Sequence, residues 1–222
     1  MSRALSLGFE VRRLVLVARL RVLAALKRAD LDVVIDRGVR IEGRVLVRVH
    51  GGTRTRVRIG RGTRIGDSVR LVLDGGELVV GERVLLRTGV VLHVRGRLTL
   101  EDECLLSYYS VVHCDEEVHV GGRVGLGEHT TISDSTHVTP PPGDWWYHHI
   151  ATAPVRLGAR TWGGAKVTIT RGVDIGADAV LAAGSVVTSD VPAGMLSGGM
   201  PARVLGPSPL SPASPDRTPS GG

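Results

Sequence analysis

The chain has 222 residues, which is long enough for one sizeable domain whose core needs neither disulfides nor a metal. It contains 30 Gly but only three Trp, three Tyr and one Phe, and this composition favours short strands turning tightly around a narrow interior over an aromatic-rich core. The net charge of +6 comes mainly from Arg residues without an accompanying nucleic-acid-binding motif, so we expect no nucleic acid partner.

Residues 1–31 predict a basic amphipathic helix. The segment 8–28 is rich in strong helix formers, and its Arg and Lys side chains fall on roughly one half of a helical wheel. Residues such as Arg12 and Arg19 break each apolar run well short of the length that crosses a bilayer, so we expect no transmembrane helix. Two alternatives stay open: the helix packs against the domain or a neighbouring subunit, or it binds peripherally to anionic lipid.

A period of six residues dominates residues 32–205. The first position of each repeat is aliphatic and the fifth is small or β-branched, as in the consecutive repeats ITRGVD, IGADAV and LAAGSV. An alternating strand repeats every two residues and a helix every 3.6, so a period of six predicts short strands separated by sharp corners, three strands to a coil. The aliphatic first-position residues are expected to stack inside the coils: Ile35, Ile41, Ile59, Ile65, Val80, Leu86, Val120, Leu126, Ile132, Leu157, Ile169, Ile175, Leu181 and Val187.

Four parts of the sequence depart from this pattern or sit at its edge. Gly163 takes a first position and leaves a gap in the expected stack, while Thr136 is expected to fill the fifth position of the repeat that begins at Ile132. Residues 138–154 contain three consecutive Pro and a Gly, which cannot continue a central strand and predict an excursion loop. Residues 206–222 have the composition of a disordered tail.

These repeats resemble those of the hexapeptide-repeat acyltransferases, whose all-β prism is a left-handed parallel β-helix. The resemblance covers residues 32–205, and its most specific part, residues 157–205, looks like the end of galactoside and maltose O-acetyltransferases and of capsule-sugar acetyltransferases. It implies an acyltransferase that moves an acetyl group from acetyl-coenzyme A to a hydroxyl of a sugar or polysaccharide precursor. It also implies a homotrimer with active sites between neighbouring subunits, and no metal cofactor.

The resemblance assigns the chemistry to two residues, and Asp134 joins them because it lies three residues before His137. His137 ends the repeat ISDSTH just before the excursion loop, where the similar enzymes have their catalytic His, and an imidazole with a pKa near ~6.5 can accept the proton of an attacking hydroxyl. The backbone N–H of Ala165, in the run TWGGAK, would donate to the oxyanion. Asp134 would orient His137, contact the acceptor or cap a corner, and these three roles stay open.

Further residues are expected to bind the two substrates. For the coenzyme these are Trp162 and Gly164, and, in the ending LAAGSVVTSDVPAGMLSGGMPARVLG, Ala183, Thr188 and Arg203, whose guanidinium would pair with a phosphate. For the acceptor, Tyr109 falls where the sugar-acetylating enzymes have an Asn. The consecutive aromatic residues Trp145, Trp146 and Tyr147 predict a platform for a sugar ring, or else a contact between subunits.

Three other functions compete with this interpretation. The first is an N-acetyltransferase, whose acceptor would be an amine, such as that of an amino sugar, instead of a hydroxyl. A second possibility is a zinc carbonic anhydrase-like enzyme that would draw its ligands from His113, His119, His129 and His137, and a third is a non-catalytic scaffold. The two Cys residues form neither a CxxC pair nor a dense framework, which indicates a reducing cytoplasmic setting, with peripheral contact at the inner membrane as the alternative for the basic helix.

Overall fold

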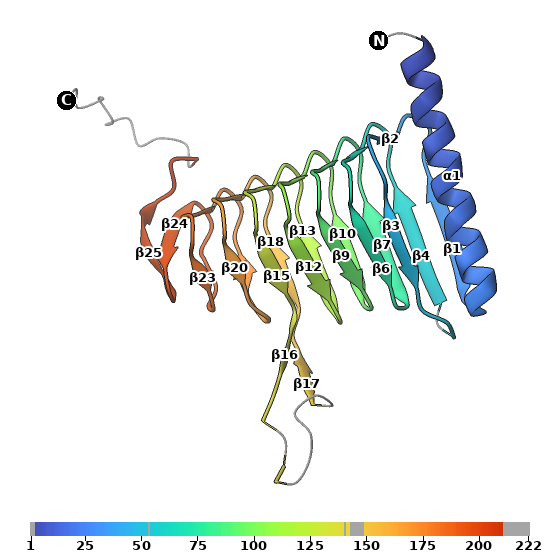
Figure 1. Ribbon diagram of the computed structural model, residues 1–222. Helices are drawn as coiled ribbons and strands as arrows, with labels where there is room; N and C mark the ends of the chain where they lie inside the picture. Colours follow the sequence, from blue (N-terminus) through green and yellow to red (C-terminus); the bar gives the residue numbers. More distant parts are fainter. Residues whose placement is uncertain (1–2, 53, 140, 143–148, 211–222) are drawn as a thin grey trace.

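Helix α1 (Arg3–Lys27) stands at one end of a prism of parallel strands, and the chain winds coil by coil towards the other end (Figure 1). The computed structural model describes residues 3–52, 54–139, 141–142 and 149–210. Each coil contributes one strand to each of three sheets, so strands that are neighbours in a sheet come from successive coils. This arrangement confirms the predicted parallel coils of three short strands with an N-terminal helix.

The three faces of the prism are named sheets 1, 2 and 3. Sheet 1 contains β1 (Asp30–Ile35), β4 (Arg54–Ile59), β7 (Gly76–Val80), β10 (Arg97–Leu100), β13 (Glu117–Val120), β18 (Val155–Leu157) and β21 (Asp174–Ile175). Sheet 2 contains β2 (Arg40–Ile41), β5 (Arg64–Ile65), β8 (Leu85–Leu86), β11 (Leu105–Leu106), β14 (Gly125–Leu126), β19 (Trp162–Gly163), β22 (Val180–Leu181), β24 (Met195–Gly199) and the antiparallel β25 (Ala202–Pro207). Sheet 3 contains β3 (Leu46–Val49), β6 (Arg70–Leu73), β9 (Val91–Val94), β12 (Val111–Cys114), β15 (Thr131–Ser133), β20 (Thr168–Ile169) and β23 (Val186–Val187).

The core is the predicted aliphatic stack. Register pairs such as Ile35 with Ile59 place first-position residues of successive coils directly beside each other, and all fourteen aliphatic ones are at most 4% exposed. Fully burying one such side chain is worth roughly 1.5–3 kcal/mol, so the stack is the main driving force for coiling. The gap at Gly163 is filled from the preceding coil, since a Cβ there would lie only 2.9 Å from Leu126 Cδ2.

The excursion is a hairpin whose strands are β16 (Ser135–His137) and β17 (Ile150–Thr152), paired antiparallel and projecting from the prism in Figure 1. Its base is closed by a hydrogen bond from Ala153 N to Asp134 O at 2.9 Å. The expectation that Thr136 fills an interior fifth position is wrong, because the chain leaves the coil at Asp134 and the Thr136 side chain is exposed. The hairpin begins at Ser135, earlier than the predicted loop.

Helix α1 covers the first coil. Leu16, Leu20 and Ala24 pack against the end of the aliphatic stack and are at most 4% exposed. Arginine side chains of the helix also donate to backbone oxygens of that coil: Arg13 Nη1 to Ile35 O at 2.9 Å and Arg19 Nη1 to Val45 O at 3.0 Å. Within the described residues the helix therefore packs against the domain, which was one of its two predicted roles.

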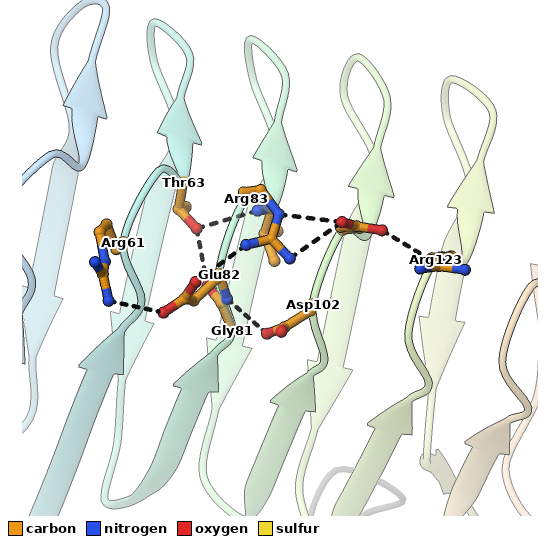
Figure 2. Close-up of polar contacts among 9 residues, drawn as sticks. Arg61, Thr63, Gly81, Glu82, Arg83, Asp102 and Arg123 are labelled. Carbon is orange, nitrogen blue, oxygen red and sulfur yellow. Dashed lines mark hydrogen bonds and ion pairs between the residues drawn. The ribbon is translucent and has the colours of Figure 1, made fainter.

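One corner of the prism carries a column of charged residues with left-handed backbone conformation. Arg83, Glu103 and Arg123 occupy equivalent positions in successive coils, with φ of 55°, 62° and 62°. Glu103 accepts hydrogen bonds from Arg83 Nε at 3.1 Å and Arg123 Nε at 2.8 Å, and Figure 2 shows the ladder continuing from Arg83 through Glu82 to Arg61. Because these groups are exposed, the ladder stabilises the corner as a network of individually weak pairs.

Both cysteines, Cys104 and Cys114, are free thiols inside the prism. Burial raises the pKa of Cys104 to about 11 and the pKa of Cys114 to about 12. The Cys104 Sγ also donates to Gly121 O at 3.1 Å. These neutral, enclosed thiols are core side chains, since only an accessible thiolate is nucleophilic.

Candidate active site

His137 lies on strand β16 of the hairpin, where its side chain is exposed. It contributes to a pocket of about 630 Å³ between the hairpin and the outer face of sheet 3. The lining is rich in imidazole, carboxylate and hydroxyl groups: His93, Arg95, His113, Asp115, Thr131, Ser133, Ser135, Thr136, His137 and Ile150. The structure therefore places the predicted base at the edge of a hollow lined mainly by polar residues, on the hairpin and not at the end of a repeat of the coil.

A second hollow of about 370 Å³ lies on the other side of the hairpin base. The two share Ser133, Ser135 and Thr136, and the second also includes Thr168, Ile169, Thr170, Arg171 and Thr188. The predicted coenzyme residue Thr188 therefore opens onto the hollow that adjoins the His137 pocket. Together the hollows run along sheet 3 past the strand that carries His137.

Two histidines that sequence reasoning did not assign to this site line its far wall. His93 and His113 are register partners on β9 and β12, and their Nδ1 atoms lie 3.2 Å apart. In a hydrogen bond between these atoms, the Nδ1–H of one ring donates to the bare Nδ1 of the other, so two neutral rings are opposite tautomers. Burial lowers the pKa of His93, and the neighbouring His113 lowers it further. Their separation of 20 residues, one coil length in this part of the chain, was the signal in the sequence.

Arg95 bridges two carboxylates beside these histidines. Its Nη2 lies 2.9 Å from Asp74 Oδ2 and its Nη1 lies 3.3 Å from Asp115 Oδ1. The pocket wall thus contains an ion-paired Arg together with acceptor oxygens, and it has no strong excess of positive charge. Such a lining suits a neutral, hydroxyl-bearing molecule better than a polyanion.

Asp134, whose role the sequence left open, caps a corner. Its Oδ1 and Oδ2 accept hydrogen bonds from the backbone N–H groups of Asp115 and Glu116, both at 2.8 Å, and its side chain is fully buried. An acceptor cannot reach a carboxylate that has no exposed surface. The corner-capping role is therefore the one that the geometry supports, and it ties the hairpin base to the preceding coil.

The predicted donor-side residues gather on sheet 2 and at the corner between sheets 2 and 3. Trp162 is 46% exposed and its ring covers Gly125, where a Cβ would lie 2.5 Å from the ring. At the corner, a Cβ on Gly127 would lie 2.6 Å from Ala165 N, and one on Gly164 would lie 2.7 Å from Ala183 N. Backbone thus packs directly on backbone here, and few side-chain atoms stand between the peptide groups and the surface.

The remaining predicted residues are spread more widely. Arg203 lies on β25, opposite Gly198 of β24, and its Nη1 donates to Ala202 O at 2.8 Å. Tyr109 stacks on His129 with ring centroids 5.5 Å apart, at the same corner as Ala165 and not in the His137 pocket. Trp145, Trp146 and Tyr147 lie outside the described residues, so the aromatic platform stays a prediction.

The zinc alternative gains no support from the part of the chain that the structure describes. There, no group of three or more His, Cys, Asp or Glu side chains is arranged to hold a metal ion. Of the four candidate ligands, His119 pairs with Glu101 (Nε2 to Oε1, 3.2 Å) on sheet 1, while His113 lies on sheet 3 and His129 stacks on Tyr109.

Within the residues that the structure describes, no helix is long and apolar enough to cross a membrane.

The known sequences that this chain resembles are named acetyltransferases. The Mycobacterium tuberculosis protein named "Probable acetyltransferase Rv3034c" is 30% identical over 166 residues, covering 72% of this chain and 53% of its own length. The galactoside O-acetyltransferase of Escherichia coli is 26% identical over 133 residues, covering 57% of this chain and 62% of the enzyme. The chain thus spans little more than half the length of these relatives. No family model matches it.

Comparison with solved structures gives the same fold. The polysialic acid O-acetyltransferase OatWY superposes with a TM-score of 0.61 at 17% identity, covering 81% of this chain and 85% of that one. AntD, an N-acyltransferase from Bacillus cereus solved with dTDP and coenzyme A, superposes with a TM-score of 0.52 at 16% identity, covering 81% and 84%. The chain has the left-handed parallel β-helix fold of these solved acyltransferases, as predicted. Its sequence relatives carry the name acetyltransferase.

Proposed function

We propose that the protein transfers an acetyl group from acetyl-coenzyme A to a hydroxyl of a sugar or polysaccharide precursor. The observation that carries this proposal is the position of His137, exposed at the edge of a polar pocket in a chain whose relatives are acetyltransferases. Galactoside O-acetyltransferase and OatWY are named for acetylating sugars, which supports a saccharide acceptor. The proposed function includes a role of this protein in polysaccharide synthesis.

His137 would act as general base. As the acceptor oxygen attacks the thioester carbonyl carbon, the imidazole takes the hydroxyl proton and the carbonyl oxygen gains negative charge, for which the backbone N–H of Ala165 would be a donor. Collapse of this intermediate breaks the C–S bond, and the imidazolium returns the proton to the leaving thiolate. General-base assistance of this kind is worth roughly 10²–10⁴-fold.

The pocket around His137 would bind the acceptor. Ser133, Ser135 and Thr136 supply hydroxyl groups, Asp115 supplies a carboxylate, and the His93–His113 pair offers one Nε2 as donor and the other as acceptor. This mixture matches the alternating donors and acceptors of a polyol. An amine acceptor stays the alternative.

The coenzyme would lie along the end of sheet 2. Trp162 presents an exposed ring for the pantetheine arm, Gly164 and Ala183 pack against each other at the adjoining corner, where their peptide groups would pair with the coenzyme, and Arg203 would pair with a phosphate. Thr188 opens onto the hollow next to the His137 pocket and would contact the acyl end. These roles rest on the resemblance together with the positions of the residues.

A second copy would complete the site. Within one chain His137 projects from the corner between sheets 3 and 1, whereas Trp162 and Ala165 lie on sheet 2 and at its corner with sheet 3. Side-by-side packing of flat prism faces would bring the hairpin of one subunit to the donor residues of the next, so we propose a homotrimer. We further propose that this protein is cytoplasmic and contacts the inner face of a membrane.

Calorimetric titration with coenzyme A and acetyl-coenzyme A tests the donor without knowledge of the acceptor. We expect about one molecule bound per subunit, and weaker binding in Trp162→Ala and Arg203→Ala. An acceptor screen with mass-spectrometric detection then tests the reaction, in which His137→Ala should lower turnover at least a hundredfold with coenzyme binding retained. Full turnover in that variant would mean that another residue is the base.

A further inference from the structure

Helix α1 has two apolar faces, and the prism covers only one of them. Opposite the buried Leu16 and Leu20, six large apolar side chains are between 51% and 74% exposed: Leu7, Val11, Leu14, Val15, Val22 and Leu26. At 100° per residue these six fall within an arc of about 120°, with Ala18 and Ala25 between them. We call this row the outer face of α1. A soluble monomer rarely exposes so many large apolar side chains in one row.

The net charge of the chain is concentrated in the same segment. Residues 1–28 contain seven Arg and Lys and one Glu, which gives +6, while the remaining 194 residues contain 21 basic and 21 acidic residues and are neutral. On the helical wheel, Arg12 and Arg19 flank one edge of the outer face and Arg21 flanks the other, and all three are exposed. An apolar face bordered by cations is the pattern of helices that lie in a membrane interface.

The geometry points to a bilayer that contains anionic lipids as the partner of the outer face of α1. The apolar side chains would enter the headgroup boundary, and the exposed Arg21 and Arg28 would meet lipid phosphates. Charge argues against a second copy as the occupant, because pairing two outer faces would bring two +6 segments together. The helix stands at one end of the prism (Figure 1), and the six apolar side chains of its outer face are at least 51% exposed. This inference is independent of the acetyl-transfer reaction.

The arginines of α1 divide between two tasks. Arg12, Arg13 and Arg19 reach back to carbonyl oxygens of the first coil, through Nη1 contacts of 2.9–3.2 Å to Ile35, Ile41 and Val45. Their substitution would loosen the helix itself. Arg21 and Arg28 are exposed and can be changed with less risk to the fold.

Co-sedimentation of the purified full chain with vesicles tests the proposal. We expect binding to phosphatidylcholine vesicles that contain phosphatidylglycerol, little binding to phosphatidylcholine alone, and loss of binding as salt is raised. Leu14→Glu/Val22→Glu should weaken partitioning by at least roughly 100-fold, because two side chains leave the apolar phase. Met200→Glu/Leu205→Glu adds the same charge at exposed apolar positions at the other end of the prism and should bind like the wild type.

Arg21→Gln/Arg28→Gln should bind roughly 30-fold more weakly, since each cation near an anionic surface favours binding by several-fold. Circular dichroism checks that each variant is folded. Failure of the wild type to bind, or equal binding of wild type and Leu14→Glu/Val22→Glu, would overturn the proposal. So would a smaller assembly of that variant in light scattering, which would identify a second copy as the occupant.

Discussion

Replacing Asp134 separates a structural carboxylate from a catalytic one. Its two oxygens accept the N–H groups of Asp115 and Glu116 at 2.8 Å, and hydrogen bonds to a charged partner contribute about 1.5–3 kcal/mol each. Because water reaches part of this corner, we take the lower value for each bond. Asp134→Ala loses both bonds, a cost of about 3 kcal/mol. Asp134→Asn keeps one acceptor oxygen but turns an amide NH2, which cannot accept, towards the other backbone N–H, so it should cost at least about half of that.

Urea unfolding followed by circular dichroism measures these costs. With a slope of about 2 kcal/mol per molar urea, the midpoint should fall by about 1.5 M in Asp134→Ala and by at least about half as much in Asp134→Asn. Coenzyme binding should be retained, since the donor residues lie on sheet 2 and at its corner with sheet 3. An Asp134→Asn protein with the wild-type urea midpoint but turnover reduced a hundredfold would refute the capping role and favour an orienting contact with His137.

Three more predictions concern the prism. Leu126→Ala removes the side chain that fills the space beside Gly163 and should cost about 3–5 kcal/mol, seen as a lower urea midpoint; an unchanged midpoint would contradict this packing. Glu103→Gln should lower the midpoint in dilute salt but not in concentrated salt, because its two Arg partners are exposed and screened. Burial raises the pKa of Cys104 and Cys114 to about 11 and 12, so each thiol loses its proton at a lower pH in the unfolded chain than in the folded chain. The free energy of unfolding should therefore fall above pH ~9 by about 1.4 kcal/mol per pH unit for each thiol. Cys104→Ala/Cys114→Ala should lack this part of the alkaline loss, and an identical loss in that variant would speak against it.

The sequence alone predicted the coiling of the chain. A six-residue period is a local property: an aliphatic residue at each first position and a compact one at the fifth suffice to define which side chains point inward. All fourteen aliphatic first-position residues are buried for this reason. The exception, Thr136, occurs where the chain leaves the period, and there the local rule no longer applies.

Contacts between coils could not be predicted in the same way, because they depend on the number of residues per coil. Asp30 pairs with Arg54, 24 residues away, but Arg156 pairs with Asp174, only 18 residues away. The period therefore does not say which residue of one coil meets which residue of the next. The His93–His113 pair was missed because of this variation.

The roles of single residues at the candidate site were also decided by tertiary structure. The sequence singled out His137 through its resemblance and left three roles open for Asp134, and only the register of the corner beside Glu116 brings two backbone N–H groups to that carboxylate. Similarly, the helical wheel of α1 identified basic and apolar positions but not which apolar face the prism covers. Hydrophobic patterning is encoded locally, whereas burial and hydrogen-bond partners depend on segments that meet only after the coils have stacked.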